Sequence, residues 1–280
     1  MKAKHPRISA QLSVGDRLSI RVLCVAMTTI DSTWTAQHAR DSFWRLYINN
    51  RDGAMLRSAT GEHILTPGRV HMIPGWVNYS CINKQDIGHF YIHFDVVGIP
   101  TVLLRQIFDR PFMLPEEVTR DKSFISFFQH MEDGDTNSAA ILCRCKSLLY
   151  WAFTDLLLQL PQEKVQLCDQ AMASQQAVQP AVRHIDLHYN TAVSNSELAS
   201  MCHMSEDYFI RRFRECVGQT PAQYVQERRV SEAAKQLIYT QNSIDQIAHD
   251  TGFGNRFYFS RVFNKHYEMG PAAYRKRQRV

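Results

Sequence analysis

An internal repeat in the last 100 residues constrains the fold of this chain more than any other feature. Residues 194–199 match residues 243–248 at an offset of 49, and one extra residue in the second copy then raises the offset to 50. Aromatic residues, an arginine and a proline recur in the same order: Tyr208 with Tyr258, Phe209 with Phe259, Arg211 with Arg261, Phe213 with Phe263, Pro221 with Pro271 and Tyr224 with Tyr274. A repeat of this length indicates one supersecondary unit that is present twice.

Each copy has the pattern of a helix, a tight turn and a second helix. Ser194 and Ser243 are good N-cap residues, and each precedes a short apolar stripe. In each second helix two phenylalanines lie four residues apart and face the core, which leaves an outward face opposite them. That face carries Asp207, Ile210, Arg211 and Arg214 in the first copy and Phe257, Ser260, Arg261 and Asn264 in the second. Two helical hairpins with solvated arginines are the plainer alternative, but arginine at matching outward positions in both copies favours reading of the DNA major groove.

A long helix is expected between the two copies. Thr220 and Pro221 form an N-cap and first-turn pair, and residues 222–239 are apolar at helical spacing. A helix of about 19 residues is about 28 Å long. Successive major grooves on one face of DNA lie about 34 Å apart. This helix could therefore hold the second helices of the two copies, which we call the readers, about one turn of DNA apart.

Three motifs in the repeat carry a family resemblance. They are Ala-His-Asp-Thr-Gly-Phe at 248–253, Tyr-Phe-Ser-Arg-Val-Phe-Asn-Lys at 258–265 and Pro-Ala-Ala-Tyr-Arg at 271–275. With these motifs the last 100 residues resemble the AraC/XylS family of transcription regulators. The resemblance implies a seven-helix DNA-binding domain at 180–280, with helix-turn-helix units at 195–217 and 244–267.

The resemblance and the outward faces together give nine candidate DNA-contacting residues. They are Asp207, Ile210, Arg211, Arg214, Arg256, Phe257, Ser260, Arg261 and Lys265. The sequence departs from the family in two places. His203 stands where the family usually has the glycine of the first turn, and histidine tolerates left-handed backbone better than most residues. Glu268 and Gly270 replace the usual Gly and Ser/Thr before the final proline, so we expect a less well capped last helix.

The first 115 or so residues have the pattern of short β-strands separated by turns. Apolar stretches occur at nearly regular spacing, at 21–28, 43–49, 54–59, 63–65, 69–73, 79–82 and 89–95. Such a series predicts a barrel or a sandwich. Residues 66–74 and 89–94 resemble the cupin-type sensor domain that often precedes this DNA-binding domain. This resemblance implies a β-barrel at 1–118 that binds a small effector, frequently a sugar.

A polar ligand in such a barrel needs several hydrogen-bonding groups beside an aromatic face. The candidate effector-binding residues are His38, Arg40, Trp44, Tyr79, His89, Tyr91 and His93. His89, Tyr91 and His93 alternate along a strand and therefore share one face. Arg40 could bind a carboxylate or vicinal hydroxyls, and Trp44 or Tyr91 could stack on a sugar. The alternatives are that both rings belong to the core and Arg40 is solvated, and that the ligand is a small acid or an aromatic compound.

A helix is predicted at 137–160, and its apolar stripe is wider than one face. A helix of this kind must bury a second face, so we interpret 119–161 as a helical dimerisation region of a homodimer. Pro161 ends the helix, and the Gln/Ala-rich segment 162–179 is interpreted as the interdomain linker. Pro180 fits the first turn of the next helix.

Several other function classes find little support in the sequence. The seven cysteines show no Cys-x-x-Cys or zinc-ribbon spacing, and no nucleophile-elbow, zincin or phosphate-binding motif occurs. We therefore expect no enzyme activity, no cofactor and no bound metal. No apolar run is long enough to span a membrane and the first residues lack a signal pattern, which favours a cytoplasmic protein. Of the net charge of +5, residues 181–280 carry +4, from 14 Lys/Arg and 10 Asp/Glu, which favours a nucleic-acid partner.

The sequence thus predicts an α+β multidomain protein, with a cupin-like β-barrel, a helical dimerisation region and an all-α DNA-binding domain. We expect a homodimeric transcription regulator, an activator with double-stranded DNA and RNA polymerase as partners, controlled by a small-molecule effector such as a carbohydrate. Two alternatives stay open: a cupin-type metal enzyme fused to a DNA-binding module, and a dimeric DNA binder without a ligand.

Overall fold

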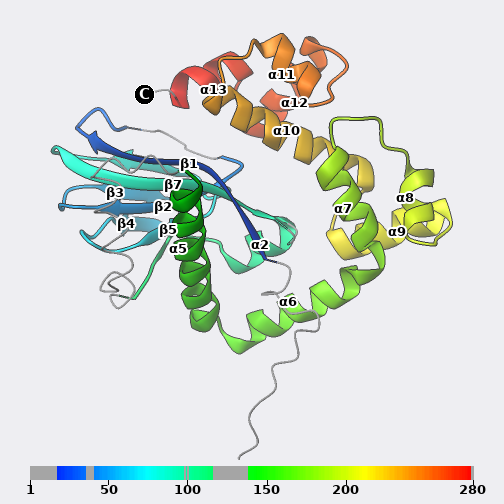
Figure 1. Cartoon of the computed structure of the whole chain (residues 1–280), viewed down its shortest axis with the longest axis horizontal. Coiled ribbons are helices and arrows are strands. Elements are labelled where there is room, and N and C mark those ends of the chain that lie inside the picture. The colour runs from blue at the N-terminus through cyan, green and yellow to red at the C-terminus, as the bar shows by residue number, and fades with distance from the viewer. Residues whose placement is uncertain (1–17, 36–40, 98, 100, 116–137, 279–280) are drawn as a thin grey trace, which may run out of the picture.

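The computed structural model describes residues 18–35, 41–97, 99, 101–115 and 138–278. A sheet-rich half is followed by a helical half, and α5 (Ser138–Gln159) lies against the sheet (Figure 1). The strands are β1 (Ser19–Ile30), β2 (Trp44–Asn49), β3 (Met55–Ser58), β4 (Gly61–Ile64), β5 (His71–Ile73), β6 (Tyr79–Ile82), β7 (Ile87–Val97) and β8 (Phe112–Met113). Each of the seven predicted apolar stretches overlaps one strand, whereas β8 and the short helix α2 (Thr101–Ile107) were not predicted.

The strands form two sheets rather than one closed surface. The first has the order β1-β7-β2-β5-β8 and the second the order β4-β3-β6. The two sheets pack on each other through a cluster that includes Tyr47 and Ile73 from the first and Leu56, Tyr79 and Cys81 from the second. Among the described strands no pairing joins the two sheets, so a closed, cupin-like barrel is not confirmed.

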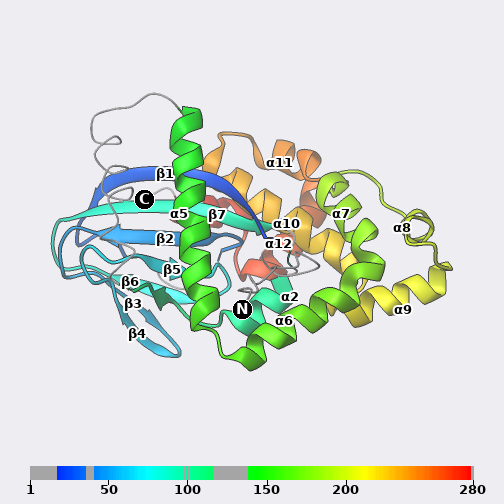
Figure 2. The ribbon, with the colours of Figure 1, turned by 60° about the horizontal axis from the view of Figure 1, so that its bottom comes forward.

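The strand β7 alternates between the two faces of the larger sheet, as its sequence predicts. Phe90, Ile92 and Phe94 belong to a core shared with α5, where Leu149 and Phe153 are buried. Figure 2 shows α5 crossing this sheet. The helix predicted at 137–160 is therefore confirmed, while residues 119–137 of the predicted dimerisation region lie outside the described residues.

The segment interpreted as the interdomain linker is helical along its length. It forms α6 (Gln162–Gln175) and the short 3-10 helix η1 (Gln176–Val178), and α7 (Gln179–His188) follows with proline in its first turn, as predicted. Glutamine and alanine are good helix formers, which explains how a polar and weakly patterned segment adopts this structure. The side chain of Gln175 is buried and donates a hydrogen bond of 2.7 Å to the carbonyl of Cys216, so α6 is anchored on the helical half.

Both predicted helix-turn-helix units are present. The helices after α7 are α8 (Asn195–Met201), α9 (Glu206–Val217), α10 (Pro221–Tyr239), α11 (Ile244–Asp250), α12 (Arg256–Tyr267) and α13 (Pro271–Gln278). The hydroxyls of Ser194 and Ser243 cap α8 and α11, and Thr220 forms a capping box with Gln223 at the start of α10. Helices α7 to α13 thus make up the expected seven-helix domain.

The turns of the two units differ in the residue that adopts left-handed backbone. His203 has a φ of 55° in the first turn and Gly252 a φ of 80° in the second. A Cβ on Gly252 would lie 2.6 Å from the carbonyl oxygen of Asn190, so this turn fits closely against the loop between α7 and α8. Glu268 ends α12 with a φ of 59°, at a position where glycine would adopt this conformation at lower cost.

Within the described residues, no helix combines the length and the apolar composition that crossing a membrane requires.

Candidate nucleic-acid interface and ligand-facing sheet

The second helix of each unit separates a buried aromatic face from an exposed basic one. Phe209 and Phe213 of α9, and Phe259 and Phe263 of α12, are fully buried. Of the nine candidate DNA-contacting residues, Ile210 and Ser260 are half-buried and the other seven are exposed: Asp207, Arg211, Arg214, Arg256, Phe257, Arg261 and Lys265. The outward orientation predicted from the repeat is therefore present in both units.

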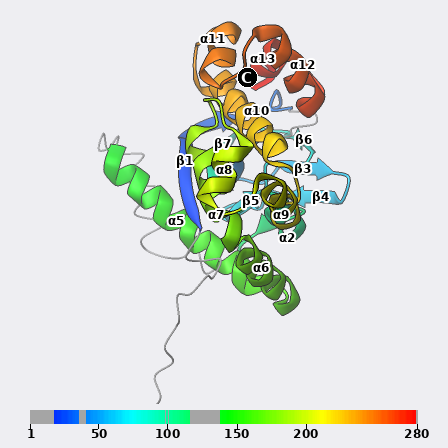
Figure 3. The same cartoon turned by 90° about the vertical axis from the view of Figure 1, so that its right-hand side faces the viewer.

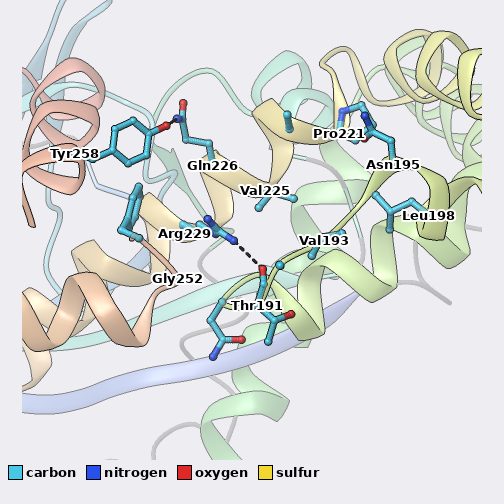
Figure 4. A pocket seen from close by; sticks show the side chains of 14 residues that line it. Thr191, Val193, Asn195, Leu198, Pro221, Val225, Gln226, Arg229, Gly252 and Tyr258 are labelled. Carbon is cyan, nitrogen blue, oxygen red and sulfur yellow. Dashed lines mark hydrogen bonds between the residues drawn. The ribbon is translucent and has the colours of Figure 1, made fainter. Parts of the chain in front are cut away.

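A groove runs along α10 between the two units (Figure 4). Its volume is about 590 Å³, and its walls come from α10, the loop between α7 and α8, and the start of α12. Arg229 crosses it and donates hydrogen bonds to the carbonyls of Tyr189 at 2.6 Å and Thr191 at 2.8 Å. Gln226 donates to the hydroxyl of Tyr258 at 2.9 Å. The groove walls are thus tied together by side chains of α10.

The face of the larger sheet that looks toward the smaller sheet carries a cluster of polar and aromatic side chains. Antiparallel pairing sets Arg45, Tyr47 and Asn49 of β2 opposite His93, Tyr91 and His89 of β7. Tyr79 of the smaller sheet lies across from them, with its hydroxyl 3.4 Å from that of Tyr47. The structure therefore brings together four predicted effector-binding residues, which are Tyr79, His89, Tyr91 and His93.

The remaining three predicted residues do not join this cluster. Trp44 is 2% exposed on the opposite face of the sheet, where it packs against Trp76, Phe108 and Phe153. Because neighbouring residues of a strand point to opposite faces, Trp44 cannot share a face with Arg45. His38 and Arg40 lie outside the described residues.

Two buried donors on this face have no acceptor within the part of the chain that the structure describes. Arg45 is 3% exposed and pairs with Asp41, yet its Nη1 atom has no hydrogen-bond acceptor among the described residues. The same holds for Nδ2 of Asn49, whose Oδ1 atom lies 2.7 Å from Nδ1 of His89. A buried donor without an acceptor is costly, so both atoms point to an additional hydrogen-bonding group.

The histidines of this face are neutral at neutral pH. Burial lowers the pKa of His89 to about 4 and holds the pKa of His93 well below its usual value. Burial likewise raises the pKa of Tyr47 to about 12. Arg45, paired with the carboxylate of Asp41, is thus the cation of a surface on which the histidines and tyrosines act as neutral hydrogen-bonding groups. Within the described residues no group of three or more possible metal ligands occurs.

The opposite end of this face meets the helical half. Nδ1 of His93 lies 2.6 Å from the hydroxyl of Tyr239 in α10, and the hydroxyl of Tyr274 in α13 donates to Asp41. Figure 3 shows α10 above the β1–β7 side of the sheet. The polar face therefore continues into the contact between the two halves.

A buried network of ion pairs reinforces this contact. Nζ of Lys235 in α10 lies 2.5 Å from Asp95 of β7 and 2.7 Å from Glu232, and Arg21 of β1 contacts both carboxylates at 2.7 Å. Burial alone would raise the pKa of Glu232, but Lys235 and Arg21 outweigh it and lower that pKa to about 2. Lys235 and Arg21 thus bridge the carboxylates of Asp95 and Glu232, and Arg228 adds a further contact to Glu232 at 3.5 Å.

Comparisons with known proteins cover both halves. A helix-turn-helix domain model matches residues 198–277. The regulatory protein SoxS of Salmonella typhimurium is 34% identical over 106 residues, which are 38% of this chain and 99% of SoxS. The raffinose operon transcriptional regulatory protein RafR of Pediococcus pentosaceus is 23% identical over 251 residues, 87% of this chain and 88% of RafR. In contrast, the chain spans only 35% of the length of YbfP of Bacillus subtilis, to which it is 36% identical over 104 residues.

Among solved structures, ToxT from Vibrio cholerae covers 94% of this chain and 98% of its own length, with 12% identity and a TM-score of 0.51. At this identity the likeness shows the fold alone, which is a sheet-rich half followed by a helical half with two helix-turn-helix units.

Proposed function

Because the chain belongs to the AraC/XylS family of transcription regulators, whose members are not enzymes, we propose that it reads specific DNA sequences through two successive major grooves. The observation that carries this proposal is the pair of exposed basic faces on α9 and α12, joined by one continuous helix. Arg211 and Arg261 occupy matching positions on these faces and can each bind a guanine edge with two hydrogen bonds.

The test is the replacement of each of these arginines by alanine. We expect Arg211→Ala and Arg261→Ala each to weaken binding of the selected operator by about 1–3 kcal/mol, the usual contribution of a bidentate guanine contact. Both side chains are exposed, so the thermal unfolding curves should not change. Arg57→Ala on β3 is the matched control, because Arg57 pairs with Glu62 on the surface of the other half. Wild-type affinity in both reader variants would contradict the proposal.

Family membership also supports the proposal that the chain activates transcription with RNA polymerase as its partner. The same membership supports a cytoplasmic location, because the DNA that the chain would bind lies there. A reporter gene behind the selected operator should then rise in expression with the intact chain and not with Arg261→Ala. Lower expression of the reporter would mean that the chain is a repressor and not an activator.

We further propose that the polar face of the larger sheet binds a small effector. The donors Nη1 of Arg45 and Nδ2 of Asn49, which meet no acceptor among the described residues, can bind the hydroxyl groups of a carbohydrate together with the neutral side chains of His89 and Tyr91. The name of RafR, a regulator of a raffinose operon, favours this class of ligand. A small organic acid is the second candidate, because the buried guanidinium of Arg45 offers its Nη1 atom as a charged donor beside its pair with Asp41.

A thermal-shift screen of sugars and small carboxylic acids tests the site. A ligand at about 100 times its Kd stabilises the folded state by about 2.7 kcal/mol, which raises the melting temperature. Tyr91→Phe and His89→Ala should each weaken the active compound by up to about tenfold in calorimetry, since each removes one hydrogen bond. Operator binding without ligand should stay as in wild type. Unchanged ligand affinity in both variants would place the site elsewhere.

The exposed side of α5 supports the proposal of a homodimer. Trp151 is 53% exposed and Leu158 is 78% exposed, and both lie on the same side of the helix, with Thr154 between them. Large apolar side chains that stay exposed on one helix face mark an interaction site. Dimers would bind paired operators more tightly through avidity.

Trp151→Glu is expected to convert the dimer to monomers in light scattering at micromolar concentration. The dimer should be lost because a carboxylate in an apolar interface has no partner, and operator binding should then weaken because avidity is lost. Lys146→Glu is the matched control, since it places a carboxylate on the same helix outside the stripe. A wild-type protein that is monomeric both free and on DNA would refute the dimer.

A further inference from the structure

In both helix-turn-helix units an exposed tyrosine precedes the reading arginine by three residues. The guanidinium carbon of Arg211 lies 5.3 Å from the centre of the Tyr208 ring, and that of Arg261 lies 5.6 Å from the centre of the Tyr258 ring. The tyrosines are 46% and 40% exposed, so neither ring is a core residue. Residues three apart on a helix are neighbours, so the repeat brings tyrosine and arginine together in both copies, and the structure adds that each guanidinium lies over the ring.

The second tyrosine is held from two further directions. Its ring centre lies 5.9 Å from that of Phe253, which is buried in the turn before α12. Its hydroxyl accepts the hydrogen bond from Gln226, and Figure 4 shows the two side chains meeting at the edge of the groove along α10. Tyr258 therefore connects the helix between the units to the arginine of the second reader.

We infer that Tyr208 and Tyr258 are positioning residues, which hold the guanidinium groups of Arg211 and Arg261 over the DNA-facing surface before DNA binds. The inference rests on the proposed reading function of these arginines. Arginine has a long side chain that loses rotamer freedom on binding, and stacking on an aromatic face removes part of this loss in advance. Gln226 fixes the ring of Tyr258 and so makes the second reader the more rigid of the two.

A direct contact of the tyrosine hydroxyls with phosphate is the competing role, because tyrosine is also a common phosphate ligand. The two roles depend on different parts of the side chain. Positioning requires the aromatic face and not the hydroxyl, whereas a phosphate contact requires the hydroxyl. Phenylalanine at 208 and 258 keeps the face and removes the hydroxyl, so it separates them.

The experiment measures operator affinity of the full chain by fluorescence anisotropy, with Tyr258→Ala, Tyr258→Leu and Tyr258→Phe in wild-type and Arg261→Ala backgrounds. We expect Ala and Leu to weaken binding about fivefold and Phe less than twofold, from the usual strength of an exposed cation–π contact together with the arginine ordering. In the Arg261→Ala background the tyrosine substitutions should have no further effect, because the ring acts through the arginine. The Tyr208 and Arg211 series should behave in the same way.

Gln226→Ala supplies the matched control between the two units. It should weaken binding up to about twofold in wild type and have no effect in Tyr258→Phe, which already lacks the hydroxyl. The losses of operator binding free energy caused by Gln226→Ala and by Tyr208→Ala should add, because the two residues act on different units. The inference would be overturned if Tyr258→Phe weakened operator binding as much as Tyr258→Ala. It would also be overturned if Tyr258→Ala still caused its full loss of affinity in the Arg261→Ala background. An Arg261→Ala variant with wild-type operator affinity would instead reject the proposed DNA-reading function of this arginine. If Tyr258→Ala unfolds, Tyr258→Leu still tests the inference, because leucine retains the apolar contact with Phe253.

Discussion

Replacing Lys235 by methionine is expected to lower the free energy of unfolding by about 3 kcal/mol, the loss typical of a broken buried ion pair. The ammonium group lies between the carboxylates of Asp95 and Glu232, and its side chain is 5% exposed. Without it, two buried carboxylates face each other with the half-exposed Arg21 as their shared cation. Urea denaturation measures the loss. Limited proteolysis should also show the two halves separating, because this network joins β7 to α10.

A second substitution separates lost pairing from lost packing. Asp95→Asn together with Lys235→Met removes one charge of each sign, so it should recover most of the stability. Lys276→Met is the control for removing an exposed lysine, and it should stay within about 0.5 kcal/mol of wild type. Equal effects of the Lys235 and Lys276 substitutions would show that the network does not hold the halves together.

The helical half follows from local sequence signals. Hydroxyl N-caps, four-residue phenylalanine spacing and proline in first turns are short-range features, and each acts within the helix that contains it. Because the signals occur twice in the same order, the helices and the outward position of Arg211 and Arg261 could be predicted together. The strands of the first half were likewise located from alternation and turn residues, with bounds that differ by a few residues.

The sequence gives weaker signals for the ligand-facing side of the sheet. All six residues of β2 are buried, so alternation between polar and apolar residues does not reveal which face is which. We expected Trp44 on the polar face, whereas the register with β7 puts Arg45 there. The signal that could have corrected this was the series Arg45, Tyr47, Asn49, which matches the alternation of His89 and Tyr91.

Sheet closure and the contact between the halves depend on residues far apart in sequence. Glu232 and Lys235 are spaced like part of a solvated stripe of α10, but their partners Arg21 and Asp95 lie more than 100 residues away. No periodicity within α10 distinguishes a solvated charge from one that is paired across a domain contact. For the same reason, the His93–Tyr239 hydrogen bond could be found only from the structure.

The separation of the two readers gives the second large expected effect. The 19 residues of α10 run without interruption from the capping box at Thr220 to the C-cap at Thr240, a length of about 28 Å. Tyr224 is buried in the core of the first unit and Leu237 in the core of the second. Both ends of the helix are thus embedded, so α10 is a rigid spacer and not a tether.

Inserting 5 base pairs between the two half-sites of the operator is therefore expected to weaken binding by on the order of 100-fold, the avidity contributed by the second unit. Half a helical turn moves one half-site to the far side of the DNA. An insertion of 10 base pairs returns it to the same side but about 34 Å farther away, so a rigid α10 cannot bridge it and affinity should stay low. Affinity measured on an operator with one half-site scrambled is the control, and both insertions should match it. Recovery of wild-type affinity at 10 base pairs would mean that the two units move independently, because only a flexible connection could then span both half-sites.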